Sequence, residues 1–428
     1  MRIWIVNHYA GGPGIGTGWR HWELARRWIG FGGDVRILAA ATSIGGRRDP
    51  RRSGLAEINR VRFHFVDAPA YGGNGLGRLR NMLAFNRGVG AEMSRLSRDR
   101  SEWPDVVIAS SPHPLAWTTA IRAARRTNAT FVAEVRDLWP ESLIELGGLP
   151  AWHPMVLWCR RADAAACCAA SMVFSPLDGI GDAIRSRGHA GLRSVVVPNG
   201  ASLQAGEPPP LDADAGALVR DARSDGRRLL LYAGAMGLPN ALDQLVDALE
   251  MLPDAGRRRL LVIMVGDGSE QARLHARCSA RGLPVRFMGI RGQDQVRALC
   301  RACDAGFIGW LDRPLYRFGI APQKRALMLG EGLPVLHAVP HCRVDEGALG
   351  TGWSVPAGDV AALSRALMSL VEASDARLAA MRSAARQCAR QQLDWDRIAA
   401  DSWQALESAV ARRTPVLSSA SRPHQPTT

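Results

Sequence analysis

The chain has 428 residues, of which 47% are hydrophobic and 22% are charged, and this ordinary globular composition excludes both a disordered chain and one embedded in a membrane. Its length exceeds what one hydrophobic core usually holds, so we expect two domains. The formal net charge of +14 favours anionic partners such as phosphates or an acidic membrane surface, but the arginines form no single basic stripe, and we expect no nucleic-acid binding.

The cysteines and the apolar stretches indicate a cytoplasmic protein. The eight cysteines lack the paired spacing of a disulfide framework. Cys300 and Cys303 form a CxxC, but no second pair completes a zinc site, so we interpret them as core thiols and expect neither a metal nor a cofactor. The first residues lack the layout of a signal peptide, and the longest apolar stretch, 155–174, contains three charged residues, which argues against a membrane span.

The first part of the chain alternates between short apolar runs and helical patterns. Residues 2–7 form an apolar run, 10–18 a loop with five glycines, 19–31 a helical pattern and 35–40 a second apolar run. Further apolar runs lie at 61–66, 106–109, 131–135 and 195–198. Strands that alternate with helices predict a parallel sheet covered by helices. We therefore expect a first Rossmann-like lobe over residues 1–203.

After a segment rich in proline and alanine, the same pattern starts again. We interpret 204–227 as a linker and expect a second Rossmann-like lobe over 228–392. Its strands are predicted at 229–232, 260–265, 285–287, 306–308 and 335–336, with a helix at 241–251. A helix at 393–411 is expected to pack back on the first lobe, and the tail 412–428 to be disordered. The predicted fold class is α/β, with two Rossmann-like lobes and a ligand cleft between them.

The only lysine of the chain, Lys324, lies in the segment 318–335, which reads FGIAPQKRALMLGEGLPV. Pro322 suits the first turn of a helix, and this places Lys324 in the same turn. Free amides at a helix N-terminus and an adjacent ammonium favour the binding of a diphosphate. The alternative is an exposed lysine at a helix start, but the chain uses arginine at every other basic position, which indicates that a compact ammonium is needed here.

Four further segments accompany this one. They are EVRDLWPES at 134–142, PNG at 198–200, YAG at 232–234 with Gly237 and NALD at 240–243, and VGDG at 265–268. With these segments the chain resembles the bacterial family 4 retaining glycosyltransferases, which have the glycosyltransferase-B (GT-B) fold. Within that family it is similar to the subgroup that makes O-antigen and capsular polysaccharides. The resemblance covers most of residues 1–410.

The resemblance implies a nucleotide-sugar donor bound mainly by the second lobe. Lys324 would bind the donor diphosphate, and the loops after Gly234 and Gly266 would line the nucleotide pocket. Glycines suit these loops because they let backbone amides approach a bulky anion. The loop that ends at Arg291 would contact the base. The complete set of expected donor-binding residues is Gly16, Gly234, Gly237, Asn240, Gly266, Asp267, Arg291, Lys324 and Glu331.

One departure from the family pattern concerns the ribose. The family has a glutamate where this chain has Leu327, and many relatives have an acidic residue where it has Gly319. A leucine cannot accept a hydrogen bond from a ribose hydroxyl. Glu331 lies one helical turn beyond Leu327, on the same predicted face as Lys324. It either replaces the missing carboxylate or is a surface residue near a turn.

In the first lobe we expect the catalytic residues at the ends of predicted strands. Arg136 and Asp137 follow one strand, and His113 follows another. For His113 the alternative is a structural role. Gly16 either approaches the donor phosphates or belongs to a structural turn. No nucleophile is assigned, because positioning and electrostatics suffice for a retaining transfer.

Six arginines alternate with apolar residues over 76–100. This pattern is typical of a basic amphipathic helix on an anionic membrane surface, although a helix that packs in the core and has a solvated face shows it too. The resemblance favours the membrane, because acceptors in such pathways are often lipid-linked. We expect a cytoplasmic protein, peripheral on the inner face of the plasma membrane, that transfers a hexosyl or N-acetylhexosaminyl group to a lipid-linked glycan. The alternatives are a nucleotide-sugar 2-epimerase and a non-catalytic partner subunit.

Overall fold

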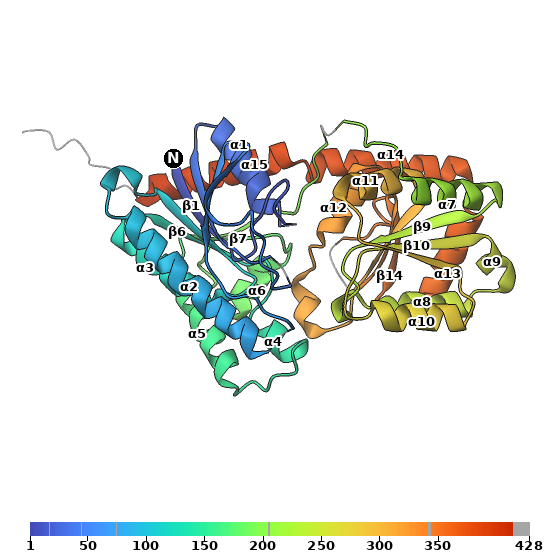
Figure 1. Ribbon diagram of the computed structural model, residues 1–428, viewed down its shortest axis with the longest axis horizontal. Helices are drawn as coiled ribbons and strands as arrows, with labels where there is room; N and C mark the ends of the chain where they lie inside the picture. Colours follow the sequence, from blue (N-terminus) through green and yellow to red (C-terminus); the bar gives the residue numbers. More distant parts are fainter. Residues whose placement is uncertain (17, 44, 74, 204–205, 341–343, 414–428) are drawn as a thin grey trace, which may run out of the picture. The chain divides into compact units, whose positions relative to one another are not determined.

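The computed structural model describes residues 1–428 except 17, 44, 74, 204–205, 341–343 and 414–428. Among the residues described, the strands form two sheets, one of eight strands and one of six, and helices flank both sheets (Figure 1). The predicted α/β fold with two lobes is confirmed. The contacts between residues divide the chain into two compact units, 1–134 with 162–173 and 399–428, and 135–161 with 174–398.

The first sheet has the strand order β3-β4-β2-β1-β5-β6-β7-β8. Its strands are β1 (Arg2–Val6), β2 (Asp34–Ala40), β3 (Gly54–Ile58), β4 (Val61–Val66), β5 (Val106–Ser110), β6 (Thr130–Glu134), β7 (Met172–Ser175) and β8 (Ser194–Val196). The pairs from β4 through β2, β1 and β5 to β6 are parallel, and β3 is antiparallel to β4. The inner strands are apolar along their whole length because helices cover both of their faces.

The helices of this part of the chain follow the strands as the sequence predicts. They are α1 (Arg20–Gly30), α2 (Leu76–Leu96), α3 (Trp117–Arg126), α4 (Glu141–Glu145), α5 (Pro154–Ala169) and α6 (Ile180–Ser186), with short 3-10 turns η1 (Arg100–Glu102) and η2 (Pro114–Ala116). The C-terminal helix α15 (Trp395–Arg413) lies along α1 (Figure 1). Trp28 Nε1 donates to the carbonyl of Ala399 at 3.1 Å, which ties these two helices together.

The second sheet has the strand order β11-β10-β9-β12-β13-β14, and its paired strands are parallel. Its strands are β9 (Arg228–Ala233), β10 (Leu260–Val265), β11 (Val285–Gly289), β12 (Ala305–Gly309), β13 (Val335–Val339) and β14 (Gly352–Pro356). Its helices are α7 (Ala213–Ser224), α8 (Leu242–Met251), α9 (Asp254–Arg258), α10 (Gln271–Ala280), α11 (Gln293–Ala302), α12 (Gln323–Gly330), α13 (Val360–Glu372) and α14 (Asp375–Gln392), with 3-10 turns η3 (Leu238–Asn240) and η4 (Pro314–Phe318).

Strand β9 shows why the second sheet needs helices on both faces. Leu230 and Tyr232 belong to the core cluster that also contains residues of α8, α10 and α13. Leu229 and Leu231 belong to the cluster with residues of α7, α11, α12 and α14. Successive residues therefore enter opposite cores, as the two-residue period of a strand requires. Both cysteines of the CxxC lie in the second cluster with no exposed surface, as predicted.

The structure differs from the sequence prediction at several elements. Strands β3, β7 and β14 were not predicted; β3 is an edge strand with mostly exposed residues, so no hydrophobic periodicity marks it. The expected linker 204–227 contains α7, whose N-cap is Asp212, with Oδ1 accepting from Ala215 N at 2.9 Å. The expected disordered tail 412–428 lies outside the described residues from 414 onward.

The predicted basic amphipathic helix at 76–100 is α2, which ends at Leu96. Its apolar side chains are buried, including Met82, Phe85, Val89 and Met93. The apolar face of α2 thus packs in the core and is not available to a membrane, whereas its basic face stays exposed. None of the helices in the described part of the chain combines the length and the apolarity needed to cross a bilayer.

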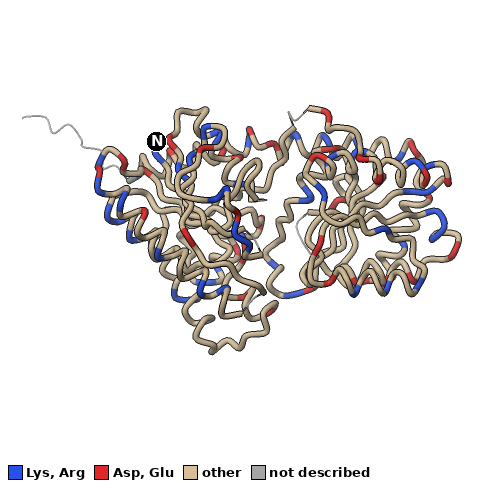
Figure 2. The backbone as a smooth tube through the Cα atoms, viewed as in Figure 1, with Lys and Arg blue, Asp and Glu red and all other residues tan. Residues whose placement is uncertain are grey.

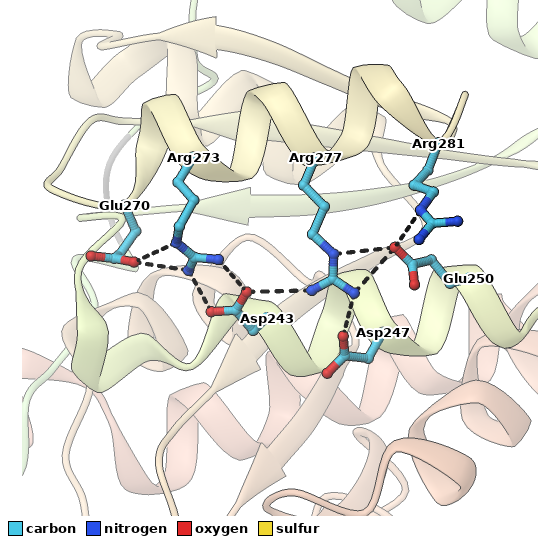
Figure 3. Close-up of polar contacts among 7 residues, drawn as sticks. All are labelled: Asp243, Asp247, Glu250, Glu270, Arg273, Arg277 and Arg281. Carbon is cyan, nitrogen blue, oxygen red and sulfur yellow. Dashed lines mark hydrogen bonds and ion pairs between the residues drawn. The ribbon is translucent and has the colours of Figure 1, made fainter.

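A ladder of ion pairs joins α8 to α10 at the surface of the second lobe (Figure 3). Arg277 lies at its centre, with Nη2 2.5 Å from Asp247 Oδ1 and Nε 3.1 Å from Glu250 Oε1. Arg273 pairs with Asp243 at 2.6 Å and with Glu270 at 2.8 Å. The arginines recur every four residues on α10, and the acids recur at similar spacing on α8. The ladder therefore fixes the register between the two helices.

Replacing Arg277 with methionine should lower the free energy of unfolding only slightly, by about 1 kcal/mol or less, because the pairs are partly exposed at the surface and screened by solvent. Urea denaturation at low and high salt measures this loss, which should shrink as salt rises. Arg281→Met is the matched control, because Arg281 Nε lies 4.0 Å from Glu250 and contributes less. A loss that does not change with salt would mean that Arg277 acts through packing.

Candidate functional site

The candidate site lies where neighbouring strands of the second sheet end. Strands β9 and β10 are parallel and paired, so the loops that begin at Gly234 and Gly266 leave the same edge of the sheet. This edge is where open α/β sheets bind ligands. Strand β12 ends at Gly309, on the other side of β9.

The glycines at these strand ends are required by close packing. Gly266 has a φ of +124°, and a Cβ added there would lie 2.0 Å from the carbonyl oxygen of Gly234. Gly268 has a φ of +155°, and its Cβ would lie 2.4 Å from the carbonyl oxygen of Met236. Any side chain at either position would push the two loops apart. The VGDG segment is therefore more than a strand followed by a turn.

Lys324 is the charged side chain next to these loops. It is the second residue of α12, and the N-cap of that helix is Pro322. Its Nζ donates to Asn240 Oδ1 at 2.7 Å and to the hydroxyl of Tyr232 at 3.4 Å. The same ammonium lies 4.5 Å from the centre of the Tyr232 ring. A Cβ on Gly234 would lie 3.6 Å from Nζ, so this glycine leaves the ammonium open to a ligand.

The electrostatic setting of Lys324 is unusual. Within the described part of the chain, no carboxylate forms an ion pair with it, whereas most neighbouring arginines have one. Burial lowers the pKa of Lys324 to about 7, because the charged form loses water and gains only neutral partners. His337 on β13 is also buried, and burial lowers its pKa to about 4, so it stays uncharged near neutrality. The site thus offers a cation that still lacks a counter-ion.

The structure brings together part of the predicted donor set. Gly234, Asn240, Gly266 and Lys324 are linked by the contacts above. Gly237 is the N-cap of η3, which carries Asn240. Asp267 is exposed, and its carbonyl oxygen accepts from Met236 N at 2.6 Å, which holds the loops after β9 and β10 together. Sequence reasoning missed Tyr232 and Trp310, whose ring centres lie 4.5 and 6.0 Å from the ammonium.

Arg291 and Glu331 have ion-pair partners elsewhere. Arg291 Nε lies 3.3 Å from Asp212 Oδ2, at the start of α7. Glu331 follows the last residue of α12, and its two oxygens accept from Arg297 and Arg301 on α11, each at 2.6 Å. Its carboxylate is only 7% exposed. These contacts account for Glu331 without a ribose. The backbone N–H of Glu331 still donates to the carbonyl of Leu327 at 3.1 Å, so the residue keeps its helical position, and it meets the arginines because α11 packs beside α12.

The two departures from the family pattern also have physical reasons. Leu327 packs against the core cluster under α12, so it stabilises the lobe. Gly319 has a φ of +105°, and a Cβ there would lie 2.0 Å from Asp178 Oδ1. An acidic side chain cannot occupy position 319 without moving this aspartate. The carboxylate of Asp178 takes the space that the first atom of such a side chain would need.

His113 pairs with a second histidine that the sequence analysis missed. His113 Nε2 lies 2.7 Å from His8 Nδ1, and Phe85 stacks on His8 with ring centres 4.2 Å apart. Burial lowers the pKa of His113 to about 3 and holds the pKa of His8 well below its usual range. Both rings are neutral at pH 7. His8 follows β1 and His113 follows β5, and these strands are paired, so their position at strand ends was the available signal.

Gly16 belongs to a loop that folds on itself. Gly11 N donates to the carbonyl of Gly18 at 3.0 Å, and Gly12 and Ile15 form a bridge. A Cβ on Gly16 would lie 2.9 Å from Nη1 of Arg52. Arg52 is buried and donates to the carbonyls of Ala10 and Ala40 at 2.6 and 3.0 Å, and burial lowers its pKa to about 10. These contacts are those of a glycine in a structural turn, which is the alternative that the sequence left open for Gly16.

Arg136 and Asp137 follow β6. Part of the Asp137 side chain reaches the surface, but the protein atoms crowded around its carboxyl raise the pKa of that group. Burial raises the pKa of Tyr316 to about 12, with the carboxylate of Asp137 adding to the rise. Glu134, at the end of β6, is fully buried and accepts from Arg20 Nε at 2.9 Å and pairs with His21 Nε2 at 2.6 Å. Glu134 is thus a structural anchor for the loop that carries Asp137. Among the described residues, no three His, Cys, Asp or Glu side chains come together to hold a metal ion.

Two family models match the chain, one for each lobe. A glycosyl transferase 4-like domain matches residues 15–200, and the glycosyl transferases group 1 model matches residues 219–388. The chain is a glycosyltransferase of the family 4, GT-B type. No curated protein matches the sequence of this glycosyltransferase. The two matched ranges contain every predicted site residue.

Solved structures share the fold of this glycosyltransferase. Sucrose-phosphate synthase from Thermosynechococcus elongatus is 16% identical with a TM-score of 0.73, over 96% of this chain and 99% of that one. HepE from Anabaena, solved in complex with UDP and glucose, is 16% identical with a TM-score of 0.65, and the match covers 95% of this chain and 100% of that one. WaaG, a glycosyltransferase involved in lipopolysaccharide biosynthesis, is 16% identical with a TM-score of 0.61, over 97% and 100%. At these identities the likeness establishes the GT-B fold.

Replacing Glu331 with glutamine should lower the free energy of unfolding by about 1–3 kcal/mol, because it leaves two arginines without their buried counter-charge. Binding of nucleoside diphosphates should stay within about twofold of the parent, since a 0.4 kcal/mol change is a factor of two. Urea denaturation and titration calorimetry measure the two effects. Weakened nucleotide binding in a variant of parental stability would instead support a ribose contact by Glu331.

Proposed function

We propose that this glycosyltransferase binds the diphosphate of a nucleotide-sugar donor at Lys324 and transfers the sugar to a lipid-linked glycan with retention of configuration. The observation that carries the proposal is the ammonium of Lys324, which lies at a sheet edge beside glycine loops without a carboxylate partner in the described residues. Asn240 and Tyr232 orient the ammonium but leave its charge uncompensated. A diphosphate supplies the missing charge.

The same contact fits the chemistry of transfer. Negative charge develops on the diphosphate as the bond to the sugar breaks, and a fixed cation in a site of low dielectric stabilises that charge. Asp137, Arg136 and His113 are proposed to act on the sugar and the acceptor at the ends of the first-sheet strands. Retention and a hexosyl or N-acetylhexosaminyl group are proposed from the family resemblance. The complex of HepE with UDP and glucose makes UDP-sugars the first donors to try.

The acceptor and its location are proposed on the same resemblance. Members of the O-antigen and capsule subgroup extend saccharides on a lipid carrier, so we propose a lipid-linked saccharide at the inner face of the plasma membrane. The net charge of +14 supports attraction to an anionic membrane surface. We propose no metal or cofactor for the reaction.

A non-catalytic partner subunit is the second candidate, and a specific observation favours it. Leu327 is apolar and packs against the core, and Glu331 is held by two arginines, so neither position supplies a free carboxylate for the ribose. A thermal-shift screen over nucleoside diphosphates and their sugars identifies the bound nucleotide. Release of the nucleoside diphosphate then supports transfer, binding without release supports the partner subunit, and an isomerised nucleotide sugar supports an epimerase.

Lys324→Ala should weaken nucleotide binding by about 1.5–3 kcal/mol, the scale of one charge-assisted hydrogen bond. The fold should be retained, because among the residues that the structure describes Lys324 makes no ion pair that stabilises the lobe. Titration calorimetry with the nucleoside diphosphate measures the loss. Arg257→Ala, on the exposed α9, removes a cation elsewhere in the same lobe and serves as the control. Unchanged affinity in Lys324→Ala would remove the diphosphate site from this position.

Affinity for the nucleotide sugar should fall as pH rises above about 7. The free Lys324 has a pKa of about 7, and a bound diphosphate raises that pKa because it favours the charged form. Above pH 7 the binding of the nucleotide sugar therefore takes up a proton, and the affinity falls by up to about tenfold for each pH unit. Below pH 7 the lysine is already charged and the affinity is highest. Calorimetry from pH 6 to pH 9 measures the slope. Lys324→Arg stays charged throughout and should show no slope, so an equal slope in both proteins contradicts the assignment.

A further inference from the structure

The segment 146–161, which consists of the loop between α4 and α5 and the first half of α5, exposes large apolar side chains. Trp152 is 74% exposed, Trp158 38% and Leu157 36%. Single exposed apolar residues are common on protein surfaces, but three within seven residues form a patch. All three belong to the second of the two compact units.

The exposure of this patch follows from how α5 packs. Val156, Cys159 and Ala162 are buried on the opposite side of the helix. The helix therefore has a complete inner face, and Leu157 and Trp158 are additional apolar residues on its outer face. A helix that needed only to cover the core would carry polar residues there.

Charge distinguishes the patch from an ordinary protein contact. Residues 146–161 contain two arginines, Arg160 and Arg161, and no aspartate or glutamate. Both arginines are exposed. The nearest preceding acids are engaged, because Glu145 accepts from Leu315 N at 2.8 Å and Glu141 pairs with Arg187 at 2.7 Å. The loop between α4 and α5 is accordingly tan throughout in Figure 2.

We propose that segment 146–161 inserts its tryptophans into the interfacial region of an anionic lipid bilayer. Indole rings favour the level of the lipid headgroups, since they are apolar and carry one polar N–H. Two adjacent arginines add attraction to anionic headgroups, on the order of 1 kcal/mol each near the surface. The occupant that fits an aromatic segment with two exposed arginines and no acid of its own is a bilayer surface.

Helix α2 cannot make the same insertion. Its apolar residues lie in the core, and its exposed arginines, including Arg80 and Arg87, offer charge alone. Leu76 is the exception, with 85% exposure at the first position of the helix. The basic amphipathic pattern predicts a membrane contact at 76–100. We assign the membrane contact to segment 146–161 instead, because the apolar residues are exposed there.

The location of the patch in the chain agrees with the proposed acceptor. Segment 146–161 begins nine residues after Asp137, so the loop proposed to act on the acceptor and the membrane contact are close in sequence. A role of the membrane contact in reaching the acceptor rests on the proposed function, because only a lipid-linked acceptor requires the enzyme to lie on a membrane. The membrane contact itself needs no sugar and is tested without one.

The test is cosedimentation of the full chain with vesicles of phosphatidylcholine containing 30% phosphatidylglycerol. The variant Trp152→Ser with Trp158→Ser should lose at least about tenfold in partition, as removal of two interfacial rings predicts. Trp152→Ser alone should lose part of the partition into vesicles. Because Trp152 lies in an exposed turn, this single variant should fold even if the double variant does not. Arg160→Gln with Arg161→Gln should weaken binding to anionic vesicles and leave binding to pure phosphatidylcholine unchanged.

The matched controls remove exposed leucines elsewhere. Leu55→Ser lies on the edge strand β3 and should bind vesicles as the parent does. Leu76→Ser with Arg80→Gln tests α2 and should cause a smaller loss than the tryptophan pair. Vesicle binding by the tryptophan variants equal to that of the parent, or no binding by the parent, overturns the proposal. Light scattering tests the alternative that the patch contacts a second copy of the chain. A concentration-dependent dimer that the parent and the control variants form and the tryptophan variants do not form overturns the proposal.

The proposed function fails in a different measurement. Nucleotide binding is followed by calorimetry without vesicles, and the tryptophan variants should retain it fully. Intact nucleotide binding with unchanged vesicle binding in those variants would reject the membrane contact alone. Vesicle binding that depends on the tryptophans, in a chain that binds no nucleotide, would reject the donor site alone.

Discussion

The candidate site depends on the close packing of Gly266 against the carbonyl of Gly234. Strands β9 and β10 are parallel neighbours, so the loops that follow them leave one edge of the sheet at the same level. A Cβ at Gly266 would lie 2.0 Å from that carbonyl, which means that the loops can meet only where side chains are absent. The ammonium of Lys324 lies beside Gly234, where a Cβ would be 3.6 Å from Nζ, and its hydrogen-bond partners are the amide of Asn240 and the hydroxyl of Tyr232.

Charge pairing explains why one lysine differs from its basic neighbours. Arg297 and Arg301 share Glu331, Arg291 pairs with Asp212, and Arg325 pairs with Glu346. Each of these arginines has its planar group fixed by a carboxylate, and each stabilises the lobe. Lys324 has an amide and a phenol instead, and burial lowers its pKa to about 7. No carboxylate of the described residues compensates its charge, so an anionic ligand would stabilise the charged form.

Helices α2 and α5 show that a similar composition can serve opposite purposes. Both mix arginines with large apolar residues. The apolar residues of α2 are buried and its arginines are solvated, whereas α5 has a second set of apolar residues outside its buried face. The difference arises from packing, because β2, β4, η2 and α3 cover most of the apolar stripe of α2. The membrane surface that we propose therefore lies on α5 and the turn before it.

The sequence by itself determined the two α/β lobes and the core role of Cys300 and Cys303, because both depend on the local periodicity of apolar residues. It also predicted glycine loops after two strands and a helix that begins near Lys324, because these depend on residues next to one another in the chain. It did not determine the partners of Glu331 and Gly16, nor the pairing of His8 with His113. Those depend on which helices and which strands are neighbours. Glu331 pairs with two arginines of α11 because α11 packs beside α12. Such partners lie far away in the chain, and only tertiary packing decides which of them meet.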